Sequence, residues 1–152
     1  VKERMVTKVA DALGEVSGST VGILGLAFKP ETDDMRDSPT LPLIRGLQKL
    51  GAKVRAYDPE AMDNARKMFD HVTFCSDAYE TAEGCDALVI ATEWNEFRAL
   101  NLERIRQAMT RPLLVDLRNL YDPRRMNEEG FEYVCVGRAA AAMPLEMRGV
   151  SH

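Results

Sequence analysis

The sequence predicts an α/β fold, in which a mainly parallel sheet of about six strands is doubly wound, with helices on both faces. Apolar runs and amphipathic segments alternate about six times along the 152 residues, and the connections between them are short. This alternation is typical of parallel strands joined by helices, and right-handed crossovers then place helices on both faces. Apolar runs such as ALVIA, residues 87–91, are typical of strands that are covered on both sides.

The first half of the chain opens with a helix. Val6, Val9 and Leu13 recur at helical spacing and Gly14 follows as a stop, which predicts a helix over 2–13. This helix starts at the first residue without an N-cap, so we expect it to be the end of a longer helix that continues upstream. Apolar runs, cap residues and glycine stops then predict a strand over 19–28, a helix opened by Ser38 and Pro39 and stopped by Gly51, a strand over 53–59, a helix over 60–69 and a strand over 71–75.

The second half continues the alternation with shorter elements. The run DALVIAT is the strongest buried strand, and Pro112 and Gly130 mark the boundaries of helices. The tail AAAAMPLEMRGVSH has no clear period, and we expect residues 139–152 to form a flexible tail. The predicted elements are a helix over 77–84, a strand over 86–92, a helix over 102–109, a strand over 113–119, a helix over 122–130 and a strand over 131–137.

Composition narrows the class of protein. The net charge of −4, from 20 basic and 24 acidic side chains, includes no dominant basic stripe, so we expect no nucleic-acid partner. No apolar run is long enough to span a bilayer, so we expect no membrane partner. Cys75, Cys85 and Cys135 are widely spaced in apolar surroundings without a C-x-x-C pair. They are interpreted as reduced core thiols of a cytoplasmic protein, and no metal site is expected.

The loop after the first strand is unusual in length and charge. Ligands of doubly wound folds bind at the carboxyl ends of the strands, and a dinucleotide fingerprint there would read G-x-G-x-x-G. Here the glycines give G-x-x-G-x-A instead, and an eleven-residue loop, 28–38, precedes the next helix. Lys29 and Arg36 in this loop suit a phosphorylated ligand near a helix N-terminus. Alternatively, Asp33, Asp34 and Asp37 pair with these cations on a solvated loop.

Other candidate ligand residues lie at later strand ends. Asp58 ends the second strand, where it can either bind a ribose or cap the following helix, and Pro59 favours the cap. Arg118 ends a central strand, where its planar guanidinium can bind a phosphate or a uracil edge, or pair internally with Asp116. Trp94 and Phe97 can floor a pocket, although core packing is the commoner use of such residues.

Four ordered blocks, GLAFKPETDDMRDSP, GAKVRAYDPEA, GCDALVIATEWNEFR and VDLRNLYDP, together resemble the C-terminal, UDP-binding domain of the UDP-glucose/GDP-mannose dehydrogenase family. The wording of FKPETDDMRDSP and DLRN is most similar to the UDP-glucose 6-dehydrogenases of that family. The resemblance implies that residues 1–16 end an inter-domain helix, and that residues 17–138 form a Rossmann-like UDP-sugar-binding domain. It also implies an enzyme that oxidises UDP-glucose with two NAD and water to UDP-glucuronate and two NADH.

The resemblance assigns roles to individual residues. Phe28 and Lys29 match family residues that contact the UDP-sugar, and Arg118 matches an arginine that contacts the UDP moiety. Arg36 matches an arginine that reaches NAD, which is held mainly by an N-terminal domain of the same parent chain. The family's G-x-C-x-P-K-D block with its nucleophilic cysteine is missing, so no catalytic residue is assigned and the isolated chain is expected to be inactive.

Two alternatives to this reading stay open. One is the same domain from a GDP-mannose or UDP-N-acetyl-mannosamine dehydrogenase, and the other is a nucleotide-binding module without catalysis. The family implies that the parent protein is a homo-oligomer.

Overall fold

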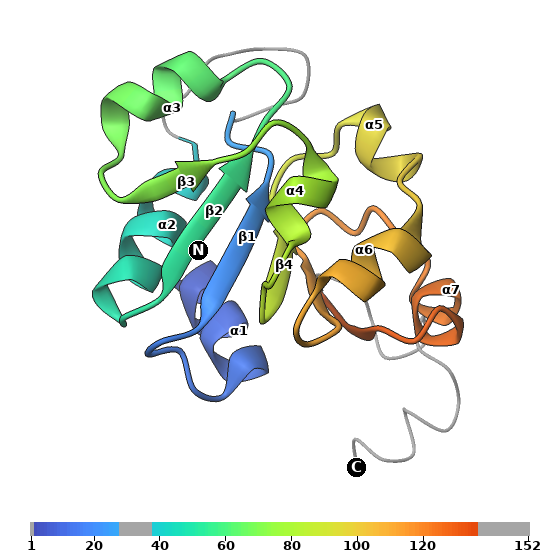
Figure 1. Ribbon diagram of the computed structural model, residues 1–152. Helices are drawn as coiled ribbons and strands as arrows, with labels where there is room; N and C mark the ends of the chain where they lie inside the picture. The colour runs from blue at the N-terminus through green and yellow to red at the C-terminus, as the bar shows by residue number, and fades with distance from the viewer. Residues whose placement is uncertain (1, 28–37, 137–152) are drawn as a thin grey trace.

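The computed structural model describes residues 2–27 and 38–136, which form one six-stranded, all-parallel sheet with helices on both faces (Figure 1). The strands lie in the order β3-β2-β1-β4-β5-β6, so the chain moves outward from β1 in one direction and then from β4 in the other. The predicted doubly wound α/β fold is therefore confirmed. The strands are β1 (Thr20–Leu24), β2 (Lys53–Tyr57), β3 (Val72–Phe74), β4 (Ala87–Ile90), β5 (Leu113–Asp116) and β6 (Glu132–Cys135).

Helices cover the two faces of the sheet in two groups. Alternate residues of β1 and β2, such as Ile23 and Val54, are buried in a core with α1, α2 and α3, whereas Leu24, Leu88 and Leu114 face a second core with α4 to α7. The two-residue period of a strand is what sends neighbouring side chains to different cores. The helices are α1 (Lys2–Leu13), α2 (Thr40–Lys49), α3 (Met62–Met68), α4 (Ala78–Ala82), α5 (Asn95–Arg98), α6 (Leu102–Ala108) and α7 (Pro123–Glu128).

The first strand is shorter than predicted. The apolar run continues to residue 28, but β1 ends at Leu24 because Gly25 turns into the left-handed region, with φ of 96°. Leu26 and Ala27 stay fully buried beyond this turn, which explains why hydrophobicity alone overestimated the length of the strand.

Two helix predictions need correction. Ser38 was expected as the N-cap of α2, but Pro39 occupies that position and the helix begins at Thr40. The Ser38 hydroxyl instead donates to the carbonyl of Leu26 at 2.7 Å. The short helix α5 was not predicted, because its four residues carry too few apolar positions to show a period.

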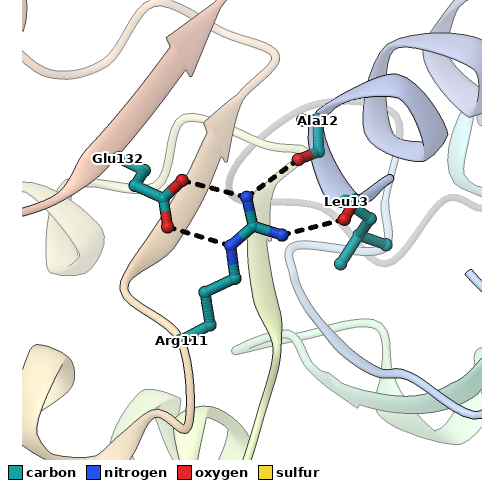
Figure 2. A network of polar contacts seen from close by, with 4 residues as sticks. All are labelled: Ala12, Leu13, Arg111 and Glu132. Carbon is teal, nitrogen blue, oxygen red and sulfur yellow. Dashed lines mark hydrogen bonds and ion pairs between the residues drawn. The ribbon is translucent and has the colours of Figure 1, made fainter. Parts of the chain in front are cut away.

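The helix α1 is tied to the sheet by Arg111, as Figure 2 shows. The Arg111 guanidinium donates to the carbonyls of Leu13 (2.8 Å) and Ala12 (3.2 Å), which end α1 without partners inside the helix. Its Nε and Nη2 atoms each lie 2.9 Å from an oxygen of Glu132 on β6, in a bidentate pair. The pair holds the pKa of Glu132 below its usual value. Charge and geometry together thus anchor the end of α1 beside the start of β6.

No helix within residues 2–27 and 38–136 is both long enough and apolar enough to cross a membrane. The division into 1–16, 17–138 and 139–152 stays a prediction. The whole tail, 139–152, and the segment 28–37 lie outside the described residues.

Candidate functional site

The switch in strand order lies between β1 and β4, and the chain segments leaving these two strands make very close contact. A Cβ atom on Gly25 would lie 2.5 Å from Cβ of Thr92 and 2.7 Å from its backbone nitrogen, so only glycine fits there. The Thr92 hydroxyl donates to the carbonyl of Ala27 at 2.9 Å. At the switch, the close approach of Gly25 and Thr92 and the hydrogen bond from Thr92 to Ala27 therefore hold the two segments together.

Asp58 ends β2 and supports this edge from the other side. One carboxylate oxygen accepts the backbone N–H groups of Leu26 (2.6 Å) and Ala27 (3.1 Å). The other accepts those of Glu60 (2.8 Å) and Ala61 (2.9 Å), in the turn that leads to α3. Asp58 is only 1% exposed and both of its oxygens are occupied, so it does not fit the ribose role and serves the turn instead.

The two ends of the segment 28–37 meet at one carbonyl oxygen. The hydroxyls of Ser38 and Thr40 each donate to the carbonyl of Leu26 at 2.7 Å, and both residues are buried. Because Ala27 precedes the segment and Ser38 follows it, the segment starts and finishes at the carboxyl edge of the sheet. Phe28, Lys29 and Arg36 belong to it and lie outside the described residues, so their roles remain predictions.

Of the residues that the family resemblance assigns to substrate or cofactor, only Arg118 lies in the described part of the chain, and its partner is Glu93. One Glu93 oxygen lies 2.8 Å from Nε and 2.6 Å from Nη2 of Arg118. The side chain of Arg118 is 31% exposed and that of Glu93 is 28% exposed. The alternative of a side-chain pair with Asp116 is wrong, because the hydrogen bond between these two residues comes from the backbone N–H of Arg118, at 3.0 Å, and not from its guanidinium. Within the described part of the chain, Nη1 of Arg118 has no partner.

Asp116 shapes the turn that carries Arg118. It is fully buried at the end of β5, and its second oxygen accepts the N–H groups of Leu120 (2.7 Å) and Tyr121 (3.0 Å) together with the Tyr133 hydroxyl (2.6 Å). The turn includes Asn119 in the left-handed region, with φ of 54°. A buried carboxylate with this many donors holds the turn in one conformation, so Arg118 leaves the sheet in a defined direction.

The segment after Glu93 packs as core. Trp94 is 9% exposed and Phe97 is fully buried, so both belong to the core rather than to a pocket floor. The Tyr57 hydroxyl donates to Glu96 at 2.8 Å and its ring meets Phe97 edge to face, which ties α5 to the end of β2. Among the described residues, the indole nitrogen of Trp94 has no acceptor.

The three cysteines are free thiols in the structure. Cys75 and Cys85 are buried, and desolvation raises the pKa of Cys85 to about 12 and raises that of Cys75 as well. A protonated, enclosed thiol is a poor nucleophile. Within residues 2–27 and 38–136, no group of three His, Cys, Asp or Glu side chains is arranged to hold a metal ion.

Sequence reasoning missed Glu93 and the pair of hydroxyls on Ser38 and Thr40. Glu93 follows β4 closely, and Ser38 and Thr40 lie at the start of α2, so their positions alone indicated that they lie near the carboxyl edge. Their partners were not readable, because Glu93 and Arg118 are 25 residues apart and meet only when β4 pairs with β5.

Comparisons with known proteins show which family the chain is similar to. Residues 22–123 match the model of the UDP-glucose/GDP-mannose dehydrogenase family, UDP binding domain. The chain is 52% identical over 130 residues to a UDP-glucose 6-dehydrogenase of Rhizobium meliloti, which covers 86% of this chain and 30% of that protein.

Two solved structures share the fold over most of the chain. A UDP-glucose dehydrogenase from Pyrobaculum islandicum superposes with a TM-score of 0.72 at 31% identity, covering 94% of this chain and 30% of that one. A UDP-D-ManNAc dehydrogenase from Pyrococcus horikoshii gives a TM-score of 0.73 at 30% identity, covering 90% and 31%. The chain spans about 30% of the length of the relatives it matches.

Proposed function

Because the chain belongs to the UDP-glucose/GDP-mannose dehydrogenase family, as its UDP-binding domain, we propose that it holds the nucleotide of the sugar substrate in an NAD-dependent UDP-glucose 6-dehydrogenase. The observation that carries the proposal is the oriented guanidinium of Arg118 at the carboxyl edge of the sheet. Doubly wound folds bind their ligands at this edge, near the switch in strand order.

Arg118 has the chemistry that a nucleotide requires. Glu93 occupies Nε and Nη2 with a single oxygen, which leaves the Nη1 face of the guanidinium available to a phosphate oxygen or a uracil carbonyl. Holding the side chain in place before the ligand arrives reduces the rotamer entropy lost on binding. Glu93 is thus a positioning residue for Arg118.

The segment between Ala27 and Ser38 completes the proposed site. Asp58, Thr92, Ser38 and Thr40 fix both of its ends at the carboxyl edge. Phe28 and Lys29 follow Ala27 directly, so we propose that they contact the sugar nucleotide, with Lys29 opposing its negative charge. Arg36 is proposed to reach NAD.

NAD and the oxidation chemistry belong to the longer protein in this proposal. NAD accepts the hydrides of the reaction when it is bound. Asp58, which is saturated by backbone N–H groups, is not a ribose ligand, and the chain has no G-x-G-x-x-G sequence. An N-terminal NAD-binding domain of the parent chain is therefore the proposed partner, and the isolated 152-residue chain is expected to show no turnover.

The other features of the parent protein are proposals of the same kind. The free thiols favour a cytoplasmic location, and the family favours a homo-oligomer. A second candidate substrate is a UDP-N-acetyl-mannosamine, because one of the superposed structures is named as a dehydrogenase of that sugar nucleotide. The higher identity to a UDP-glucose 6-dehydrogenase favours UDP-glucose.

Binding constants of the full-length protein test the proposal. Arg118→Gln should weaken the binding of UDP-glucose and of UDP about tenfold or more, because a charge-assisted hydrogen bond is lost. It should leave the affinity for NAD unchanged. Arg36→Ala should weaken the binding of NAD more than the binding of UDP-glucose. Unchanged UDP affinity in Arg118→Gln would overturn the proposed role of this edge. Stronger effects of Arg36→Ala on UDP-glucose than on NAD would reverse the assignment of the loop.

A further inference from the structure

We propose that the opposite, amino-terminal edge of the sheet carries a second binding site, for a small phosphate-bearing molecule. An open pocket of about 500 Å³ lies there, where β1, β2 and β3 begin. Pockets of this size accommodate a sugar phosphate or a nucleotide. The polar residues of its lining are Thr20, Gln48, Lys53, Arg55, His71 and Thr73.

Strand register brings the polar lining together on one face. Thr20 pairs with Lys53 across β1 and β2, and Arg55 pairs with Thr73 across β2 and β3. Register partners in a parallel sheet point to the same face, and Lys53 and Arg55 are two residues apart on one strand. Two cations and two hydroxyls therefore project from one patch of sheet.

The lining is cationic and contains no carboxylate. Lys53 and His71 are exposed, and Arg55 is half-buried. The nearby carboxylate of Asp86 accepts the backbone N–H of Thr20 at 2.8 Å and is not among the lining residues. The pocket thus offers positive charge in a chain whose net charge is −4, which favours an anionic ligand at this place.

Arg55 is held in position at the wall of the pocket. Its Nη2 and Nε atoms donate to the carbonyls of Glu80 (2.6 Å) and Thr81 (3.3 Å) on α4. Within the described part of the chain Nη1 has no partner, so its two hydrogens can serve a phosphate oxygen. The carbonyls that hold Arg55 carry no net charge, so they do not offset its positive charge as a paired carboxylate would.

The far wall is also braced. The Gln48 amide donates to the carbonyl of Asp70 at 2.8 Å, which fixes the turn before β3. His71 follows in the left-handed region with φ of 61°, a conformation that is uncommon for residues other than glycine. The turn therefore places the exposed His71 in the lining of the pocket, together with Lys53 and Arg55.

This pocket is separate from the site proposed above. The first and last residues of a five-residue strand are roughly 13 Å apart, and no residue of the pocket lining is part of the Arg118 and Glu93 pair. A ligand here would leave the carboxyl edge accessible.

Calorimetric titration of the full-length protein tests the proposal, with inorganic pyrophosphate, glucose 1-phosphate and AMP as probes at physiological salt. We expect saturable binding of at least one probe, and the identity of the strongest probe distinguishes a sugar phosphate from a nucleotide. Lys53→Gln should weaken that binding about tenfold, and Lys53→Arg should restore most of it. Lys67→Gln, an exposed change on α3, serves as the charge-matched control.

The outcomes separate this site from the substrate site. Probe binding that depends on Lys53 and persists in Arg118→Gln supports the proposal, whatever the fate of UDP binding. Absence of binding by all three probes overturns it. Equal weakening by Lys53→Gln and Lys67→Gln overturns it as well, because non-specific charge would then explain the binding. Probe binding that is lost in Arg118→Gln but retained in Lys53→Gln places the probe at the carboxyl edge and also contradicts the proposal.

Discussion

A single carboxylate oxygen of Glu93 lies 2.8 Å from Nε and 2.6 Å from Nη2 of Arg118. The two residues leave neighbouring strands, β4 and β5, at the same edge of the sheet. The pair restrains the guanidinium, and within the described part of the chain it leaves Nη1 without a partner, which is the arrangement on which the proposed nucleotide contact rests.

Removing the restraint should weaken nucleotide binding without abolishing it. In the full-length protein, Glu93→Gln should weaken UDP about three- to tenfold, because an unheld arginine loses about 0.5–1.5 kcal/mol of rotamer entropy on binding. In an Arg118→Gln background the same change should have almost no effect. A double-mutant cycle by calorimetry measures this coupling. Additive effects of the two changes would mean that Glu93 acts independently of Arg118.

Asp58 is expected to be a stability residue. Asp58→Asn replaces one acceptor oxygen by an amide that cannot accept, so two of four buried N–H groups lose their partner, at a cost of about 2–4 kcal/mol. Urea unfolding of the chain measures this loss. Asp63→Asn, at a side chain 94% exposed, is the matched control and should change stability by less than about 0.5 kcal/mol. Wild-type stability in Asp58→Asn would mean that the four hydrogen bonds to Asp58 do not stabilise the fold.

Gly25 should not tolerate a side chain. Gly25→Ala combines a left-handed backbone with an overlap against Thr92, at a cost of about 3 kcal/mol or more. Gly84→Ala also has positive φ but meets nothing within 4 Å, and should cost about 1–2 kcal/mol. The difference between the two variants in thermal unfolding isolates the overlap. Equal losses would show that the carboxyl edge relaxes around a methyl group.

The three cysteines should differ in reactivity. Burial raises the pKa of the Cys85 thiol to about 12, so this thiol stays protonated at pH 8 and reacts slowly with an aromatic disulfide reagent. Cys135, which is less buried, should react first in the native chain. All three thiols should react at once in urea. Rapid native labelling of Cys85, identified by peptide mapping, would contradict its enclosed position.

The Arg111 and Glu132 pair should make stability depend on pH in the acid range. The lowered pKa of Glu132 stabilises the fold above its unfolded value of about 4.3, and this stabilisation disappears as pH falls through the folded pKa. The side chains are 36% and 50% exposed, which limits the effect to about 0.5–1 kcal/mol. Glu132→Gln should therefore be less stable at pH 7 and nearly equal to the wild type at pH 3. Glu128→Gln, at an exposed position, serves as control.

Much of the architecture was predictable from the sequence, because buried parallel strands must be apolar along their length. The run at 86–92 became β4 and the glycine stop at Gly51 ended α2, with φ of 98°. The end of β1 was not predictable, since Leu26 and Ala27 are as buried as the strand itself. There, a backbone turn at Gly25 ends the strand, and hydrophobicity gives no signal of it.

The site was predictable by position and less so by partner. The position of Arg118 at the carboxyl edge was predictable because it follows a central strand, and the cap role of Asp58 was favoured because Pro59 follows it. The second pair of donors to Asp58, on Leu26 and Ala27, was invisible because it comes from a strand end about 30 residues away. Contacts of this kind depend on which strands become neighbours, and periodicity does not encode that order.

The shared carbonyl of Leu26 gives the fold room to vary. Ser38 and Thr40 bind the carbonyl of Leu26, so the chain returns to the point where it left the sheet. The sheet is therefore the same whatever number of residues lies between Ala27 and Ser38. Doubling the length of such a loop costs only about 0.6 kcal/mol of closure entropy. A loop anchored in this way should therefore tolerate inserted or deleted residues without refolding of the domain that supports it.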